Sequence, residues 1–306
     1  MSRAVRFERY GGVEVLEVVD VEPPQPAEGQ VLVRVRAAGI NPFESKLRRG
    51  LLRDQIKLSF PAAQGTDVSG IVEQVGPGVD EVAVGAEVFG SAVRGSHAEL
   101  ARIPHARLLP LPTGLSWEVA GGLWTVATTA SAAVGAVDLG PQDVVVVAGA
   151  AGGVGGLAAQ LARHRGASVV GVAGERSHPW LRSRGIIPVT YGDGLEERLR
   201  QLAPAGARLG ALVDTVGGGY VELGIRLGID PGRINTIVDF DAAASNGAMS
   251  VGGQAAGSSE VAEVARLLAA GELELPIAAT FALEQVQEAY TLLEQGHPAG
   301  KIVLIP

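Results

Sequence analysis

The sequence contains no cysteine among its 306 residues. This absence excludes disulfides, a thiol nucleophile, iron–sulfur clusters and every cysteine-ligated zinc site. The histidines do not replace the missing ligands, because none of them share the spacing of a metal site; they are His97, His105, His164, His178 and His297. We therefore predict no metal centre and assign no histidine to catalysis.

Clustered positive charge and long apolar runs are also absent. The net charge of -8 comes from 33 acidic and 25 basic residues spread along the chain. The sequence therefore has no stripe of basic residues that would bind a phosphate backbone, and we do not expect nucleic acid as a partner. The most apolar stretch, Val126–Val137, is shorter than the ~20 residues needed to cross a bilayer. Residues 1–10 lack the apolar segment of a secretory signal. We expect a cytoplasmic protein without membrane contact.

The first part of the chain has the pattern of a β-rich domain. Residues Val31–Ala38 alternate with period two, which is typical of a strand with one wetter face. Further short strands are bounded by turn-forming residues, and they are predicted at Ser69–Val75, Glu87–Phe89 and His97–Ile103. A hydrophobic content of 47% is enough for two buried cores in a chain of this length.

The pattern changes after residues 110–112. Near-continuous apolar runs alternate with helical segments, as expected for parallel strands covered on both faces; these runs are Val144–Val147, Val169–Val172, Leu212–Val213 and Ile234–Val238. The second part is therefore predicted to be a doubly wound α/β layer. The tail predicts a strand at Ala279–Leu283, a helix, and a final strand at Lys301–Ile305 that packs back on the first domain.

A glycine-rich turn joins the first strand of this layer to an amphipathic helix. Its glycines follow the spacing GxxGxxG, and the contacts predicted for a dinucleotide pyrophosphate are Gly149, Ala151, Gly152, Gly153, Val154 and Gly155. The alternative is a purely structural tight turn. If the turn holds the pyrophosphate, Gly155→Val is expected to abolish cofactor binding while the fold survives.

The end of the next strand indicates which nicotinamide cofactor binds. An NAD enzyme normally has an acidic residue there for the ribose 2′-hydroxyl, whereas this chain has Ala173-Gly174. The first position of this pair is apolar and small, which leaves room for a 2′-phosphate beside Gly174, and Arg176 can pair with that phosphate. We therefore predict NADPH. The alternative is that Arg176 is simply solvated and Glu175 binds the hydroxyl of NADH.

Four motifs occur together in one order along the chain: Ala38-Gly39-Ile40-Asn41-Pro42, Gly65-Thr66-Asp67-Val68-Ser69-Gly70 with Val75-Gly76-Pro77-Gly78-Val79, the glycine turn, and Gly300-Lys301-Ile302-Val303-Leu304. Through these four motifs the chain resembles the medium-chain dehydrogenase/reductase superfamily. Within that superfamily it resembles the zinc-free quinone oxidoreductases related to zeta-crystallin. The resemblance implies a Rossmann doubly wound parallel sheet (residues 121–270) inserted in a β-rich GroES-like catalytic domain (1–120 and 271–306), with the active site between the two domains.

The resemblance also implies an activity, which is hydride transfer from NADPH to a quinone or an α,β-unsaturated carbonyl compound. Zinc-dependent relatives read Gly-His-Glu where this chain reads Gly65-Thr66-Asp67, so a zinc-free reaction is expected. Two alternatives remain open: an enoyl thioester reductase of natural-product metabolism, and a non-catalytic protein that binds or senses NADPH. The family further suggests a homodimer.

Candidate catalytic residues follow from the same motifs. Asn41 is implied to orient the acceptor, although it could instead hold the Asn-Pro turn. Lys46 is a candidate donor, with a solvated lysine on a basic helix beside Arg48 and Arg49 as the alternative. Asp67 is expected to be structural and to bond local backbone N–H groups.

The remaining implied contacts are with the cofactor. They are Thr128 on the nicotinamide side, Tyr191 with Arg176 at the 2′-phosphate, backbone groups around Val238, Val251 and Gly252 at the carboxamide, and Lys301 from the tail. Between residues 232 and 259 the chain is shorter than its relatives, which predicts an unusual substrate pocket.

Overall fold

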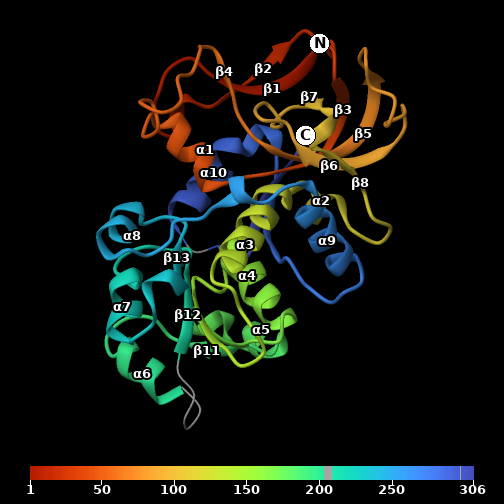
Figure 1. Cartoon of the computed structure of the whole chain (residues 1–306). Helices are drawn as coiled ribbons and strands as arrows, with labels where there is room; N and C mark the ends of the chain where they lie inside the picture. Colours follow the sequence, from red (N-terminus) through yellow and green to blue (C-terminus); the bar gives the residue numbers. More distant parts are fainter. Residues whose placement is uncertain (203–208, 297) are drawn as a thin grey trace. The chain divides into compact units, whose positions relative to one another are not determined.

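The computed structural model describes residues 1–202, 209–296 and 298–306, so His297 lies outside the described residues. The chain forms two compact units. Unit 1 comprises Met1–Thr125, Ala265–Glu272 and Pro276–Pro306, and unit 2 comprises Val126–Val264 and Leu273–Leu275. Both ends of the chain belong to unit 1 (Figure 1).

Unit 1 is built mainly of antiparallel strands. Its larger sheet has the order β14-β15-β3-β5-β6-β8, with β7 also paired to β3, and its smaller sheet has the order β2-β1-β4. The strands are β1 (Ser2–Phe7), β2 (Glu17–Val21), β3 (Gln30–Gly39), β4 (Ala62–Ala63), β5 (Asp67–Val75), β6 (Glu87–Ser91), β7 (Leu100–Pro104), β8 (Leu108–Pro110), β14 (Ile277–Ala282) and β15 (Lys301–Ile305).

Strand β3 is central to this unit and follows the predicted period-two pattern only in its middle, because Leu32 and Ala38 on the face expected to be wetter are buried. Val31, Val33 and Val35 are buried in a core shared with β5, β6 and β7, whereas Arg34 and Arg36 are exposed. The alternation arises because successive side chains of a strand point to opposite faces. The predicted β-rich first domain is therefore present.

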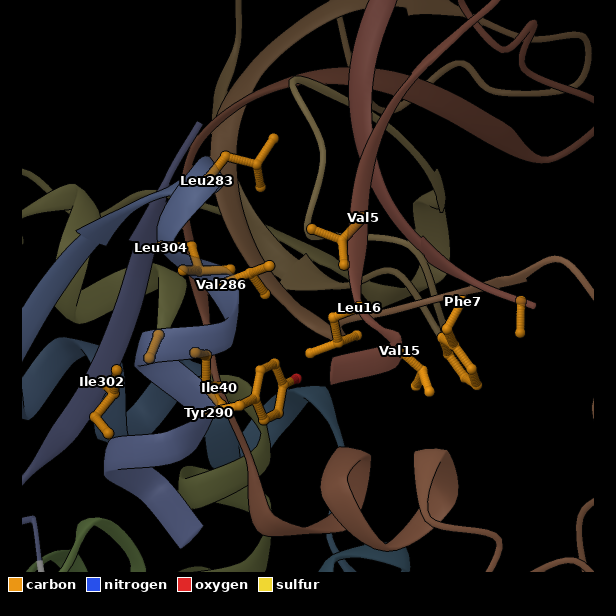
Figure 2. Close-up of a cluster of buried hydrophobic side chains, with 12 residues drawn as sticks. Val5, Phe7, Val15, Leu16, Ile40, Leu283, Val286, Tyr290, Ile302 and Leu304 are labelled. Atoms are coloured by element: carbon orange, nitrogen blue, oxygen red, sulfur yellow. The ribbon is translucent and has the colours of Figure 1, made fainter. Parts of the chain in front are cut away.

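A second core of unit 1 joins the two ends of the chain. Strand β15 pairs antiparallel with β3, with Leu304 opposite Ala38, which confirms that the tail packs back on the first part. Figure 2 shows the resulting cluster of apolar side chains, to which α10 (Val286–Glu294) contributes Tyr290 and β15 contributes Ile302. The other helices within unit 1 are α1 (Pro42–Arg48) and α2 (Trp117–Gly121).

Unit 2 contains a parallel sheet with the strand order β11-β10-β9-β12-β13. The strands are β9 (Val144–Ala148), β10 (Ser168–Val172), β11 (Ile187–Val189), β12 (Leu209–Asp214) and β13 (Ile234–Thr236). The predicted doubly wound layer is confirmed. Strand β11 was not predicted from the sequence, because its Pro188 argues against a strand; the structure places it at the sheet edge, where proline is tolerated.

Helices cover both faces of this sheet. Val144 and Val146 of β9 pack in one core with Leu199 of α6 and Val221 of α7, while Figure 1 shows α4 and α5 on the other side. The helices of unit 2 are α4 (Gly153–His164), α5 (His178–Ser183), α6 (Leu195–Leu202), α7 (Tyr220–Arg226) and α8 (Phe240–Asn246); α3 (Trp124–Ala136) and α9 (Ser258–Ala269) have residues in both units. The strand order reverses between β9 and β12, which is where open α/β sheets bind ligands.

The segment after β13 pairs with that strand at one residue. Met249 forms an isolated parallel bridge with Asn235, in which its N–H donates to the Ile234 carbonyl over 2.8 Å and its carbonyl accepts from the Thr236 N–H over 3.0 Å. The buried Asn235 amide then accepts from the Val251 N–H over 2.7 Å and donates to the Val251 carbonyl over 3.0 Å. This side chain thus satisfies both backbone groups of Val251. No helix in the described part of the chain is both long and apolar enough to span a membrane.

Candidate functional site

The glycine turn of unit 2 is tight because its backbone folds onto the neighbouring strand. The N–H groups of Gly149 and Ala150 both donate to the carbonyl of Val172 at the end of β10, each over 3.1 Å. Gly149 has a φ of +76°, a conformation that side chains other than glycine rarely adopt, and the N–H of Gly152 donates to its carbonyl over 2.9 Å. The turn therefore delivers the chain directly into α4.

The first turn of α4 presents unpaired donors. The N–H of Gly156 donates to the carbonyl of Gly152 over 2.8 Å and is the first of the intrahelical series. The preceding N–H groups, of Gly153, Val154 and Gly155, have no intrahelical acceptor and lie at the positive end of the helix. A Cβ built on Gly152 would lie 3.4 Å from its nearest neighbour, the Gly149 carbonyl oxygen, and unpaired donors at a helix N-terminus are the groups that bind anions.

Gly155 has a different role from Gly152. A Cβ at Gly155 would lie 2.2 Å from the carbonyl oxygen of Gly149 and 2.7 Å from its carbonyl carbon, and both atoms belong to the backbone. No side chain fits without moving the turn. Gly155→Val would therefore force the helix and the turn apart as well as alter the predicted cofactor site, because this glycine packs the helix against the turn.

The structure brings Gly174 and Tyr191 together at the carboxyl ends of β10 and β11. A Cβ on Gly174 would lie 3.7 Å from Cε1 and 3.8 Å from the hydroxyl oxygen of Tyr191. Tyr191 is 52% exposed, and both Glu175 and Arg176 are exposed in the short 3-10 helix that follows Gly174. The predicted 2′-phosphate contacts thus share one edge of the sheet.

Thr128 and the segment Val251–Gly253 also lie together. A Cβ on Gly253 would lie 3.0 Å from the hydroxyl oxygen of Thr128. Two of the backbone donors predicted for the carboxamide have acceptors within the protein, since the Val251 N–H bonds Asn235 and the Val238 N–H bonds the Thr236 hydroxyl over 3.2 Å. Gly252 is open, because a Cβ there would meet nothing within 4 Å.

Unit 1 holds a second cluster, centred on Asn41. The ammonium group of Lys301 donates to the Asn41 side-chain oxygen over 2.6 Å and to the Ile40 carbonyl over 2.8 Å. Asn41 is 2% exposed and Lys301 is 4% exposed, so the two groups meet away from water. The sequence implied both residues at the site but did not indicate that they bond to each other.

The side-chain nitrogen of Asn41 faces three acceptors. It donates to Asp67 Oδ2 over 3.2 Å and lies 3.4 Å from both Thr66 Oγ1 and Glu44 Oε1. Asp67 Oδ1 accepts from the backbone N–H of Thr125 over 3.1 Å and from its hydroxyl. Asp67 is structural as expected, but the expectation of local partners is wrong, because Thr125 lies 58 positions further along the chain.

Glu44 is a member of the cluster that the sequence reading missed. This buried carboxylate accepts from the backbone N–H of Asn41 over 2.9 Å, from the Thr66 hydroxyl over 2.7 Å and from the Tyr290 hydroxyl over 2.7 Å. It is the third residue of α1, after the N-cap Asn41, which is the glutamate position of a capping box. The spacing of Asn41 and Glu44 was the available signal.

The other side chains of α1 are not a uniformly solvated basic face. Lys46 is exposed, whereas Arg48 is fully buried, pairs with Glu294, and lies with its guanidinium 4.9 Å from the centre of the Tyr290 ring. The exposure of Lys46 agrees with the alternative of a solvated lysine, and the burial of Arg48 was not predicted. A guanidinium can enter a core when a carboxylate and an aromatic face replace its water.

Burial sets the ionisation of this cluster. It raises the pKa of Asp67 to about 6, although Lys301 opposes the rise. Burial also lowers the pKa of Lys301, against the attraction of Asp67, whose Oδ2 is 4.0 Å from Nζ. The pKa of His97 is lowered by burial too, and its Nε2 lies 3.2 Å from the Gly39 carbonyl oxygen. Within the described ranges, no three His, Asp or Glu side chains gather in a way that could hold a metal.

Comparison with known proteins gives matches along the whole chain. Residues 27–113 match the alcohol dehydrogenase GroES-like domain family, and residues 198–304 match the zinc-binding dehydrogenase family. Quinone oxidoreductase 1 of Escherichia coli (strain K12) is 27% identical over 332 aligned positions that cover 100% of both chains.

Two solved structures agree with these matches. The quinone oxidoreductase from Coxiella burnetii superimposes with a TM-score of 0.87 at 27% identity, covering 100% of this chain and 99% of the other. An NAD-dependent alcohol dehydrogenase superimposes with a TM-score of 0.88 at 28% identity, covering 99% of each chain.

Proposed function

Because the chain belongs to the medium-chain dehydrogenase/reductase superfamily, with quinone oxidoreductases among its relatives, we propose that it transfers hydride from NADPH to a quinone or a conjugated enone without a metal ion. The observation that carries the proposal is the turn after β9, where three backbone donors at the start of α4 have no intrahelical acceptor at the point of strand reversal. Bound NADPH supplies the hydride.

The residues of unit 2 fit this cofactor. The N–H groups of Gly153, Val154 and Gly155 bind the pyrophosphate, and Gly174 provides the space for a 2′-phosphate that Arg176 and Tyr191 contact. Ala173-Gly174 favours NADPH, because no acidic side chain repels the phosphate there. The pair Thr128 and Gly252 is assigned to the nicotinamide end. One of the similar solved structures is an NAD-dependent alcohol dehydrogenase, so the binding of NADPH and of NADH must be compared.

The residues of unit 1 fit a metal-free reduction. As hydride arrives, negative charge develops on the acceptor oxygen and needs a hydrogen-bond donor or a proton. The ammonium group of Lys301 places a positive charge beside Asn41 in unit 1, whereas the absence of cysteine removes the usual zinc ligands. Lys46 is the exposed alternative donor.

The test is the loss of reduced-nicotinamide absorbance with purified protein and a panel of quinones, enones and enoyl thioesters, each run with NADPH and with NADH. We expect turnover with a quinone or enone and a preference for NADPH. Binding of NADPH without turnover of any acceptor would contradict the proposal and favour a sensing protein. Light scattering tests the homodimer that we propose alongside the activity.

An enoyl thioester reductase is the second candidate, and two exposed apolar side chains of unit 2 favour it. Val216, which follows β12, and Phe240 of α8 are exposed by 51% and 56%, which suits a bulky acceptor. Turnover of the thioesters alone in the same panel would select this activity.

A further inference from the structure

The carboxylate of Asp214 lies buried at the end of β12 and collects three hydrogen-bond donors. Its Oδ1 accepts from the backbone N–H groups of Val216 and Gly217, each over 2.9 Å, and its Oδ2 accepts from the Thr236 hydroxyl over 2.7 Å. Thr236 lies directly opposite Asp214, because β12 and β13 are parallel neighbours in this register. A carboxylate offers acceptors only, so it matches this set of donors.

Thr236 extends the reach of this carboxylate to the next loop. Its hydroxyl gives its one proton to Asp214 and accepts from the backbone N–H groups of Val238 over 3.2 Å and Asp239 over 3.0 Å. The side chain of Asp239 then accepts from the Ala242 N–H at the start of α8. Asp214 and Thr236, which we call the clamp, therefore hold the loops that follow two neighbouring strands.

The first of these loops packs on the glycine turn. The Thr215 hydroxyl donates to the carbonyl of Ala148 at the end of β9 over 2.7 Å. A Cβ built on Gly149 would lie 2.5 Å from Val216 Cγ2, so the exposed Val216 side chain lies against the turn. The clamp therefore fixes where this apolar side chain stands beside the proposed pyrophosphate site.

The loop after β12 depends on the clamp because its own sequence is mostly glycine. Gly217, Gly218 and Gly219 follow one another with φ of +79°, +76° and +93°, and such a run has no side chains that could hold it in place. The two bonds to Asp214 fix the start of the loop. A Cβ on Gly217 would lie 3.4 Å from Val238 Cγ2, so the two loops held by the clamp contact each other.

The position of the clamp indicates which part of a dinucleotide it affects. A sheet of this order binds a dinucleotide across the crevice at the strand reversal, with one nucleotide on each half of the sheet. Gly174 and Tyr191 follow β10 and β11 and are assigned to the nucleotide that carries the 2′-phosphate. The loops after β12 and β13 therefore fall to the other nucleotide, which in NADPH carries the nicotinamide.

We propose that the clamp positions the nicotinamide of bound NADPH, because it holds Val216 and Val238 where the ring and its ribose contact them. The inference rests on the proposed function. It assigns positioning and not chemistry to Asp214 and Thr236, since both are buried and their side chains bond within the protein. Hydride transfer depends on alignment, and a misplacement of about 1 Å can cost about 100-fold in rate. Loss of the clamp should therefore slow hydride transfer more than it weakens NADPH binding, because the donors of α4 stay in place.

The experiment compares wild type, Thr236→Val, Thr236→Ser, Asp214→Asn and the double variant Thr236→Val/Asp214→Asn. It measures kcat, the NADPH dissociation constant and the fluorescence emission of bound NADPH, which reports the surroundings of the nicotinamide and needs no acceptor. Thr236→Val keeps the shape of the side chain but leaves the N–H groups of Val238 and Asp239 without their acceptor. We expect kcat to fall about 10- to 100-fold and the emission to change, with an NADPH dissociation constant within about twofold of wild type. Thr236→Ser keeps the hydroxyl and should restore most of the rate.

Asp214→Asn tests whether the two residues act as one clamp. The asparagine oxygen can still accept from Val216 and Gly217, but its nitrogen cannot accept the Thr236 proton. We expect the loss seen in Thr236→Val and no further loss in the double variant, because both changes break the same chain of hydrogen bonds. Thr291→Val is the matched control. It removes a hydroxyl that bonds the Gln287 carbonyl within α10 of unit 1, and it should leave all three measurements unchanged.

Three results would overturn the inference. They are wild-type kcat and emission in Thr236→Val, losses that multiply in the double variant, and a rate that Thr236→Ser does not restore. If Asp214→Asn does not fold, the Thr236→Val and Thr236→Ser pair decides alone. Absence of turnover in wild type would refute the proposed function, and the emission of bound NADPH in the Thr236 variants would then decide on the clamp.

Discussion

Lys301 donates a hydrogen bond of 2.6 Å to the side-chain oxygen of Asn41, although 260 positions separate the two residues. The bond joins the start of β15 to the N-cap of α1. It also determines how the amide is oriented, because the Asn41 oxygen must face the ammonium group while its nitrogen faces Asp67 and Glu44. Both ends of the chain are thus required to form the cluster in unit 1.

Replacing Lys301 distinguishes this role from a contact with the cofactor. Lys301→Met leaves Asp67 buried without its cation, and removing one partner of a buried pair costs about 3–5 kcal/mol. We expect a loss of that order in the free energy of unfolding, measured by urea denaturation, with an unchanged NADPH dissociation constant at a temperature where the variant is folded. Weaker NADPH binding with wild-type stability would place Lys301 at the cofactor instead.

The ionisation of Asp67 predicts a specific pH dependence of stability. Its pKa is about 6 in the folded protein and 3.8 in the reference state, so the folded state holds this proton more tightly. The contribution is present below pH 3.8 and is lost as pH rises through about 6; it amounts to about 3 kcal/mol. The unfolding free energy of wild type should therefore fall relative to Asp67→Asn between pH 4 and 7. A difference that is constant over this range would contradict the raised pKa.

The two glycines of the turn should respond differently to substitution. Gly152→Val adds a side chain beside the free donors of α4, with its Cβ no closer than 3.4 Å to other atoms, so we expect a folded protein with at least tenfold weaker NADPH binding, which is about 1.4 kcal/mol. Gly155→Ala should instead lower the melting temperature, because its Cβ meets the Gly149 carbonyl. Fluorescence titration and thermal unfolding of both variants make the comparison. Unchanged NADPH affinity in Gly152→Val would refute the pyrophosphate site.

Arg176 tests the preference for NADPH. If its guanidinium pairs with the 2′-phosphate, Arg176→Ala should weaken NADPH binding about 10-fold or more and leave NADH binding nearly unchanged, since only NADPH carries that phosphate. The measurement is the ratio of the two dissociation constants in wild type and variant. An equal loss for both cofactors would show that Arg176 does not recognise the phosphate. Glu175→Gln is the companion variant, because it should weaken NADH only if Glu175 binds the ribose hydroxyl.

The fold class could be predicted because its signals are local. Local patterns report which faces of an element are buried. They are the alternation of Val31, Val33 and Val35 and the apolar runs around β9 and β10, and the structure confirms a strand at each. Strand β11 could not be predicted in this way, since Pro188 is acceptable only at a sheet edge, and edge position is a property of the whole sheet.

The site was only partly accessible from the sequence. Motifs named Asn41, Lys301 and the glycine turn, and their contacts with cofactor and acceptor stay predictions. Glu44, Thr66 and the burial of Arg48 depend on what surrounds each side chain after folding, which no spacing records. The difference between Gly152 and Gly155 likewise depends on distances to the carbonyl of Gly149.

By itself, then, the sequence determined the two kinds of sheet, the glycine turn between β9 and α4, and the lack of cysteine ligands for a metal, because periodicity, turn chemistry and composition are properties of neighbouring residues. Only the tertiary structure decided which charges meet. Lys301, Asp67 and Asn41 come from distant strands and a helix terminus, and Asn41 meets partners 26 and 260 positions away. The ionisation of Asp67 and Lys301 is set by burial and by their mutual attraction, which exist only once those elements have packed.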